Sequence, residues 1–86
     1  MLKIGFTLSR HAQDRMASRQ IPHEWIERLL RNPARVVPDP VDSDLKQAFG
    51  IIPEMDNRVL RIVYNGRNAV PHIVTVHFYR RMKGLL

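Results

Sequence analysis

Two segments in the second half of the chain, Val59–Asn65 and His72–Tyr79, are rich in β-branched and aromatic residues. This composition is typical of β-strands, in which successive side chains point to opposite faces of a sheet. The bulky apolar residues at every second position share one face: Leu60, Ile62 and Tyr64, then Val74, Val76 and Phe78. Because this face must be kept from water, the chain has to fold into layers, with other elements covering the sheet.

Two earlier segments have the pattern of short amphipathic helices. The first runs from about Arg10 to Arg19 after Ser9, a good N-cap, and the second from about His23 to Arg31. Asn32-Pro33 ends the second helix, because a residue before proline avoids the helical conformation. The apolar residues that we expect to face the sheet are Ala12, Met16, Trp25, Ile26, Leu29 and Leu30.

Three further segments complete the expected sheet: a short opening strand Lys3–Phe6, a second short strand Ala34–Val37, and a main strand Leu45–Ile52. Short connections between the main strands indicate antiparallel neighbours. The sequence therefore predicts an α+β fold with two N-terminal helices packed on a three- or four-stranded antiparallel sheet. With 86 residues, we expect one domain spanning 1–86.

Several classes of protein are disfavoured by composition. The chain has no cysteine, which excludes disulfides and thiolate chemistry. No apolar run approaches the about 20 residues of a membrane span, and the first residues lack the apolar stretch of a signal peptide. We therefore expect a cytoplasmic protein that has no membrane partner.

The charge is strongly basic and unevenly distributed. Fourteen Lys and Arg stand against eight Asp and Glu, a net charge of +6, and eleven of the fourteen are Arg. Arginine presents a planar fork of donors that suits phosphate groups. From Asn57 to Leu86 there are six cations and no acid, which indicates a nucleic-acid partner or an acidic protein partner.

Two groups of residues are candidates for a site. His11, Arg15 and Arg19 recur every four residues and line one stripe of the first helix, beside its apolar stripe. Arg61, His77 and Tyr79 fall on the sheet face opposite the apolar one. The basic residues that continue beyond the last strand are Arg80, Arg81 and Lys83.

These side chains have the chemistry that RNA cleavage by transesterification needs: a base for the 2′-hydroxyl, a proton donor for the 5′-oxygen, and cations for the phosphorane. Histidine and tyrosine are also good strand formers, so a purely structural role stays open. We expect no cofactor and no metal. His72 and His77 are five residues apart and on opposite faces of a regular strand, so they cannot chelate one ion together.

The motif Arg10-His11-Ala12-x-x-Arg15-Met16-x-x-Arg19-x-Ile21, with a helix that ends Arg31-Asn32-Pro33, resembles domain-of-unknown-function family 4258, a small bacterial family. Later segments fit the same pattern: Ala48-Phe49-Gly50, Leu60-Arg61-Ile62-Val63 and Ile73-Val74-Thr75-Val76. The resemblance implies a RelE/ParE-like domain, a distant relative of the basic toxins of toxin–antitoxin pairs. Many of those toxins cut mRNA without a metal, and others poison DNA gyrase.

The first functional hypothesis is a metal-independent endoribonuclease that acts on RNA or ribosome-bound mRNA. His77 is the first candidate for general acid or base, with His11 as the second. Arg61, assisted by Arg80 and Arg81, stabilises the phosphorane, and Tyr79 donates a proton or stacks on a base. The residues expected to bind nucleic acid are Arg15, Arg19, Arg80, Arg81 and Lys83.

The alternative hypothesis is a non-enzymatic, toxin-like or regulatory domain whose basic surface binds nucleic acid or an acidic protein. In both hypotheses an acidic or DNA-binding antitoxin is the expected protein partner. A housekeeping domain without a toxin role is the third possibility. The resemblance carries over no catalytic residues, so the site assignments come from the side-chain chemistry.

Overall fold

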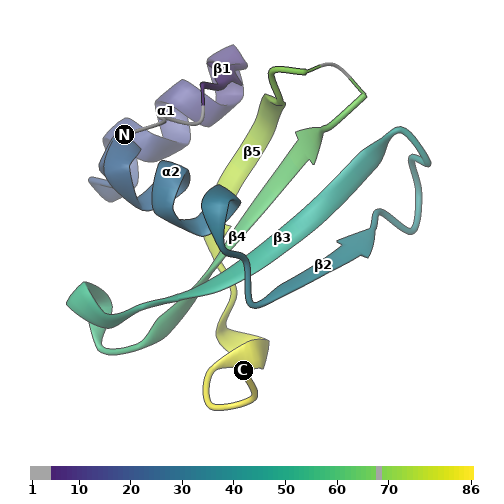
Figure 1. Ribbon diagram of the computed structural model, residues 1–86. Coiled ribbons are helices and arrows are strands. Elements are labelled where there is room, and N and C mark those ends of the chain that lie inside the picture. Colours follow the sequence, from purple (N-terminus) through teal and green to yellow (C-terminus); the bar gives the residue numbers. More distant parts are fainter. Residues whose placement is uncertain (1–4, 68) are drawn as a thin grey trace.

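The computed structural model describes residues 5–67 and 69–86 and combines two α-helices with a five-stranded sheet (Figure 1). The elements in chain order are β1 (Thr7–Leu8), α1 (Arg10–Arg19), α2 (His23–Arg31), β2 (Arg35–Pro38), β3 (Leu45–Ile52), the 3-10 turn η1 (Pro53–Met55), β4 (Arg58–Asn65), β5 (His72–Phe78) and the 3-10 turn η2 (Arg80–Met82). The expected α+β class is confirmed, and both helices begin and end where the sequence indicates.

Ser9 joins the start of α1 to the sheet. Its Oγ accepts a hydrogen bond from the Ala12 N–H at 3.0 Å and donates one to the Val74 carbonyl at 2.7 Å. One hydroxyl thus caps the helix and holds it against β5. The helix ends at Gln20, which adopts a left-handed conformation with φ 54°. Within the described residues, neither helix has the length and apolar character needed to span a membrane.

The sheet differs from the expected antiparallel one. Its strand order is β1-β5-β4-β3-β2, and the short first strand pairs parallel with β5, so the sheet is mixed and has five strands. The expected opening strand Lys3–Phe6 is wrong where it can be judged: Lys3 and Ile4 lie outside the described residues, and Gly5 and Phe6 are not in a strand. The strand forms at Thr7–Leu8 instead, because the N–H groups of Thr7 and Ser9 donate to the carbonyls of Pro71 and Ile73.

A β-bulge changes which residue of β5 enters the core. The pairing of β4 with β5 shifts register between Val63 and Tyr64, so Tyr64 lies opposite Ile73. Ile73 is fully buried against the helices, whereas Val74, expected there from simple alternation, lies outside the core cluster. Beyond the bulge the alternation holds, and Val76 is fully buried as expected.

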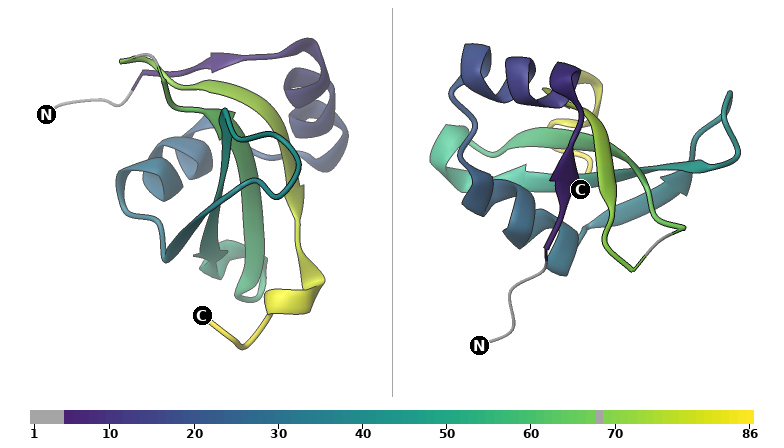
Figure 2. Two further views of the ribbon diagram at one scale, coloured as in Figure 1. Left: turned by 90° about the vertical axis from the view of Figure 1, so that its right-hand side faces the viewer. Right: turned by 90° about the horizontal axis from the view of Figure 1, so that it is seen from above.

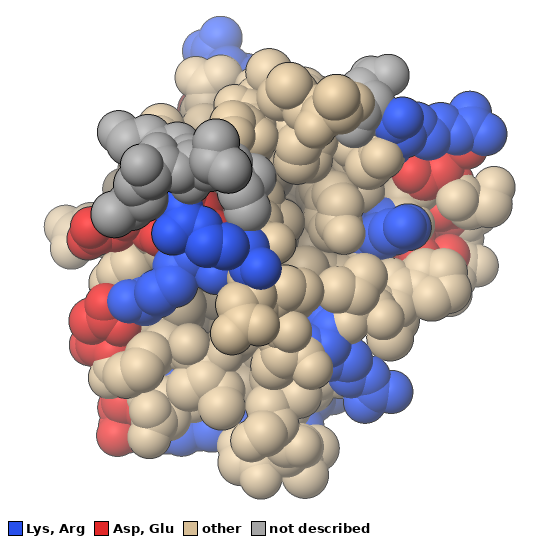
Figure 3. Space-filling model, in the orientation of Figure 1, with Lys and Arg blue, Asp and Glu red and all other residues tan. Residues whose placement is uncertain are grey.

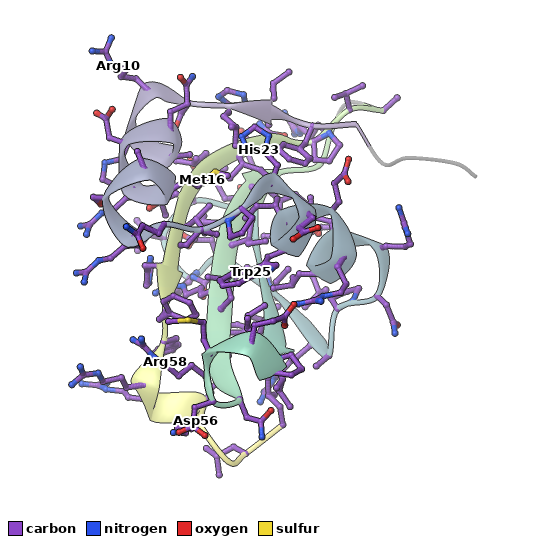
Figure 4. All side chains as sticks on the ribbon, turned by 90° about the vertical axis from the view of Figure 1, so that its left-hand side faces the viewer. Arg10, Met16, His23, Trp25, Asp56 and Arg58 are labelled. Carbon is purple, nitrogen blue, oxygen red and sulfur yellow. The ribbon has the colours of Figure 1, made fainter. Side chains whose placement is uncertain are left out.

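Both helices cover the same face of the sheet, α1 over β5 and α2 over β3 (Figures 1 and 2). Met16 and Trp25 lie between the two helices and above the strands (Figure 4). We name the other side, which neither α-helix covers, the open face. Its residues, by strand register, are Arg35 and Val37 of β2, Gln47, Phe49 and Ile51 of β3, Val59, Arg61 and Val63 of β4, and Thr75 and His77 of β5.

Gly50 permits the close packing of α2 on β3. A Cβ added at Gly50 would lie 2.7 Å from Cγ of Leu29, which is only 4% exposed and therefore has little room to move. We expect Gly50→Ala to lower the free energy of unfolding by about 1–3 kcal/mol, because overpacking forces side chains and backbone to shift. Urea denaturation measures this change. Gly5→Ala, where the new Cβ meets nothing within 4 Å, is the control, and equal stability of the two variants would contradict this packing.

Candidate functional site

Arg61 and His77 form the centre of the candidate site. They are directly opposite each other in the antiparallel pair β4–β5, on the open face, and Arg61 Nη1 lies 3.2 Å from His77 Nε2. A guanidinium has donors and no acceptor, so this contact requires Nε2 to be the acceptor. The geometry therefore assigns a neutral imidazole whose proton is on Nδ1.

The surroundings of His77 favour the same neutral state. Partial burial is the largest cause that lowers the pKa of His77, and the charges of Arg61, Arg15 and His11 lower it further. Near neutral pH an imidazole of this kind accepts a proton rather than carrying one. His77 thus has the protonation state that a general base needs.

Two aromatic rings continue the site on the open face. The Arg61 guanidinium carbon lies 5.5 Å from the centre of the Tyr79 ring, and the rings of Tyr79 and Phe49 are 5.6 Å apart. Arg61 Nε is buried and has no hydrogen-bond partner among the described residues. The Nε–H donor of the guanidinium is therefore unpaired, while cation–π contact with Tyr79 stabilises the position of the group.

The C-terminal part of β5 is an edge of the sheet, because β1 pairs only with His72 and Ile73 at the start of this strand. Beside this edge lies a cavity of about 470 Å³, which we name the edge cavity. Its lining residues are Ser18, Arg19, Gln20, Met55, Arg58, His77, Phe78 and Arg80. Three arginines and one histidine face this space without any carboxylate among the lining residues, which is the composition expected of an anion site.

Of the residues predicted from the sequence, the structure brings Arg61, His77 and Tyr79 together, and Arg19 and Arg80 line the edge cavity with His77. His11 and Arg15 are exposed on α1 and act on His77 through charge. Arg81 is exposed in η2, and Lys83 forms an ion pair with Asp56 at 3.2 Å. The last two cations thus lie at the border of the site.

Arg58 is a site residue that sequence reasoning missed. Its guanidinium lies 4.2 Å from the centre of the Phe78 ring, at the end of β5, and it lines the edge cavity (Figure 4). Alternation along β4 places Arg58 on the helix-facing side, away from Arg61 and His77. Because the cavity is at the edge of the sheet, side chains from both faces reach it, and the sequence carries no signal of this.

Some of the basic residues elsewhere are paired with acidic neighbours. At the left and upper right of the face shown in Figure 3, acidic and basic side chains lie next to each other. Two pairs of this kind are Arg28–Glu54 at 2.8 Å and Arg67–Asp44 at 3.2 Å. In contrast, Arg19, Arg58 and Arg80 form no ion pair with any part of the chain that the structure describes. The edge cavity is therefore lined by three arginines whose charge no acidic side chain of the described residues neutralises.

Comparison with known proteins identifies the family. Residues 8–78 match the family described as domain of unknown function (DUF4258). The chain belongs to this family. The match includes His11, Arg61 and His77 and ends before Tyr79 and the cations that follow it. Neither the curated proteins nor the solved structures contain a match to this chain.

The lowered pKa of His77 predicts a pH dependence of stability. Unfolding returns His77 to its ordinary pKa of about 6.5, so below that pH the unfolded chain takes up a proton that the folded chain does not. The free energy of unfolding therefore falls as the pH drops through this range, until the pH reaches the lowered pKa. Urea denaturation at pH 8 and pH 5.5 measures the loss.

His77→Gln keeps an acceptor for Arg61 and cannot titrate, so we expect it to lose less stability than the wild type between these two pH values. His23→Gln, at an exposed position on α2, is the matched control and should follow the wild type. An equal loss of stability in the wild type and in His77→Gln would contradict the lowered pKa.

Proposed function

We propose that this protein is an endoribonuclease that cleaves RNA with its own side chains and without a metal ion. The observation that carries the proposal is the edge cavity, where Arg19, Arg58 and Arg80 line the same space as His77, whose imidazole Arg61 holds neutral. Cations that bind a phosphodiester beside a group able to accept a proton are the parts needed for transesterification. Among the described residues, no three His, Asp or Glu side chains gather as metal ligands.

The proposed reaction proceeds in one displacement at phosphorus. His77 takes the proton of the 2′-hydroxyl, and the 2′-oxygen forms a bond to phosphorus while the bond to the 5′-oxygen breaks. Tyr79 or His11 gives a proton to the departing 5′-oxygen. Arg61, with Arg80 and Arg58, stabilises the negative charge of the phosphorane. The products are a 2′,3′-cyclic phosphate and a 5′-hydroxyl end.

Arg61 has a second role in this proposal. In the free protein its Nη1–H donates a hydrogen bond to the lone pair of His77 Nε2. This nitrogen is the atom that must accept the proton of the 2′-hydroxyl. A bound phosphodiester offers Arg61 a charged acceptor, which is a stronger partner than imidazole. Substrate binding thus frees His77 Nε2 at the moment when the base is needed.

The proposed biological setting is a toxin–antitoxin pair, in line with the RelE/ParE-like relation implied by the sequence. In this setting the substrate is mRNA, free or bound to a ribosome, and the protein is cytoplasmic. An acidic or DNA-binding antitoxin covers the positive charge of the edge cavity and of the C-terminal cations.

A second candidate function is a basic binding domain without catalysis. The observation that favours it is the same Arg61–His77 hydrogen bond, which leaves no free lone pair on the imidazole in the resting protein. In this case the arginines bind RNA or an acidic protein partner, and the histidine only positions Arg61.

Purified protein incubated with end-labelled RNA and EDTA, with and without ribosomes, tests the first candidate. We expect cleavage to fragments that end in a 2′,3′-cyclic phosphate. His77→Ala and Arg61→Ala should each reduce the rate by about 100-fold or more, because each removes a group that acts in the transition state.

The matched controls are His23→Ala on α2 and Arg67→Ala in the β4–β5 connection, which both lie outside the site and should cleave like the wild type. Circular dichroism verifies that all variants fold. Folded His77→Ala that cleaves at the wild-type rate would contradict the assigned base. Salt-sensitive RNA binding without cleavage by the wild type would favour the second candidate.

A further inference from the structure

Four residues in register form a row across the open face. Arg35 of β2 is opposite Phe49 of β3, Phe49 is opposite Arg61 of β4, and Arg61 is opposite His77 of β5. Neighbouring strands are about 4.8 Å apart, so the row extends about 14 Å across the strands. A cation, an aromatic ring, a second cation and the proposed base thus follow one another across the sheet. The Phe49 ring is only 2% exposed, so the side chains of the row that a ligand can contact are Arg35, Arg61 and His77.

The row borders a second cavity of about 400 Å³ on the open face, which we name the row pocket. It is lined by Arg35, Phe49, Arg61 and Tyr79, together with Gln47, Met82 and three residues of β2 and the following loop, Val37, Pro38 and Pro40. Arg61 borders the row pocket and also contacts His77, which lines the edge cavity. The hydrogen-bonded pair therefore connects the two cavities, with Arg61 lining the row pocket and His77 lining the edge cavity.

One wall of the row pocket is held firmly by Asp39. Its Oδ2 accepts hydrogen bonds from the N–H groups of Val41 at 3.0 Å and Asp42 at 2.9 Å. Its Oδ1 accepts one from Nε2 of Gln47 at 2.8 Å, and Gln47 is only 7% exposed. The loop that follows β2 is thus fastened to β3, and the pocket is formed before any ligand binds. The left panel of Figure 2 shows this loop in front of the strands.

We propose that the row pocket binds one unpaired nucleobase of the RNA, and that the strand crosses the sheet along the row from Arg35 to His77. Tyr79 offers a ring on which a base stacks, and the Arg61 guanidinium adds a cation–π surface. Arg35 binds the phosphate at the far end of the row, about two strand spacings from Arg61. This inference rests on the proposed function for the chemistry at His77, whereas binding in the pocket requires no cleavage.

The length and lining of the row favour a single-stranded nucleic acid over a duplex or an acidic peptide. A stacked strand advances about 3.4 Å per nucleotide, so the row of about 14 Å accommodates several nucleotides. A base paired in a duplex presents only its edge and cannot enter between side chains. An acidic peptide can form ion pairs with the two arginines, but its carboxylates gain little binding free energy from the aromatic ring and prolines between them.

Fluorescence anisotropy with a fluorescein-labelled 2′-O-methyl adenosine tetranucleotide tests the inference, because this probe lacks the 2′-hydroxyl and cannot be cleaved. We expect Arg35→Ala to weaken binding of the tetranucleotide about 5-fold or more, and binding of the matching dinucleotide less than 2-fold. Tyr79→Ala should weaken binding of the tetranucleotide, and Tyr79→Phe should restore it because the ring is kept.

Lys46→Ala is the matched control, since Lys46 is an exposed cation of β3 on the opposite face from Phe49. Its affinity should stay within 2-fold of the wild type. Unchanged affinity in both Arg35→Ala and Tyr79→Ala would overturn the inference. Loss of cleavage alone, with these binding effects intact, would overturn the proposed function and leave the row pocket standing.

Discussion

The hydrogen bond between Arg61 and His77 is the interaction on which the site depends. It exists because β4 and β5 pair in a register that sets these two residues opposite each other on the face without helices. It fixes which imidazole nitrogen carries the proton, and it directs the charge of Arg61 toward the proposed base. With burial, that charge keeps His77 neutral in a region crowded with cations.

The irregular parts of the fold build the surroundings of this pair. The short β1 leaves the C-terminal half of β5 without a strand partner on its outer side, so Arg19 of α1 and Arg80 of η2 line a cavity there together with His77. Ser9 holds α1 in this position by bonding to both the helix and β5.

The sequence predicted the elements well because helix caps, prolines and alternation are local signals. It also placed Arg61, His77 and Tyr79 on one face, since side-chain parity depends only on position along a strand. It could not predict the bulge that moves Ile73 into the core, or the parallel pairing of β1, because both depend on contacts between distant segments. The place of Arg58 in the site was missed for the same reason, because Arg58 and His77 line a common cavity only at the edge of the sheet.

The most direct measurement is the ring ¹⁵N NMR spectrum of His77 at pH 7, recorded through the long-range couplings to the ring protons. We expect an unprotonated Nε2 that accepts a hydrogen bond and a protonated Nδ1. In Arg61→Ala, Nε2 should lose this hydrogen bond, and the ¹⁵N signal should move toward that of a free imidazole. A protonated Nε2 in the wild type, or a doubly protonated ring, would contradict the central role given to the Arg61–His77 pair.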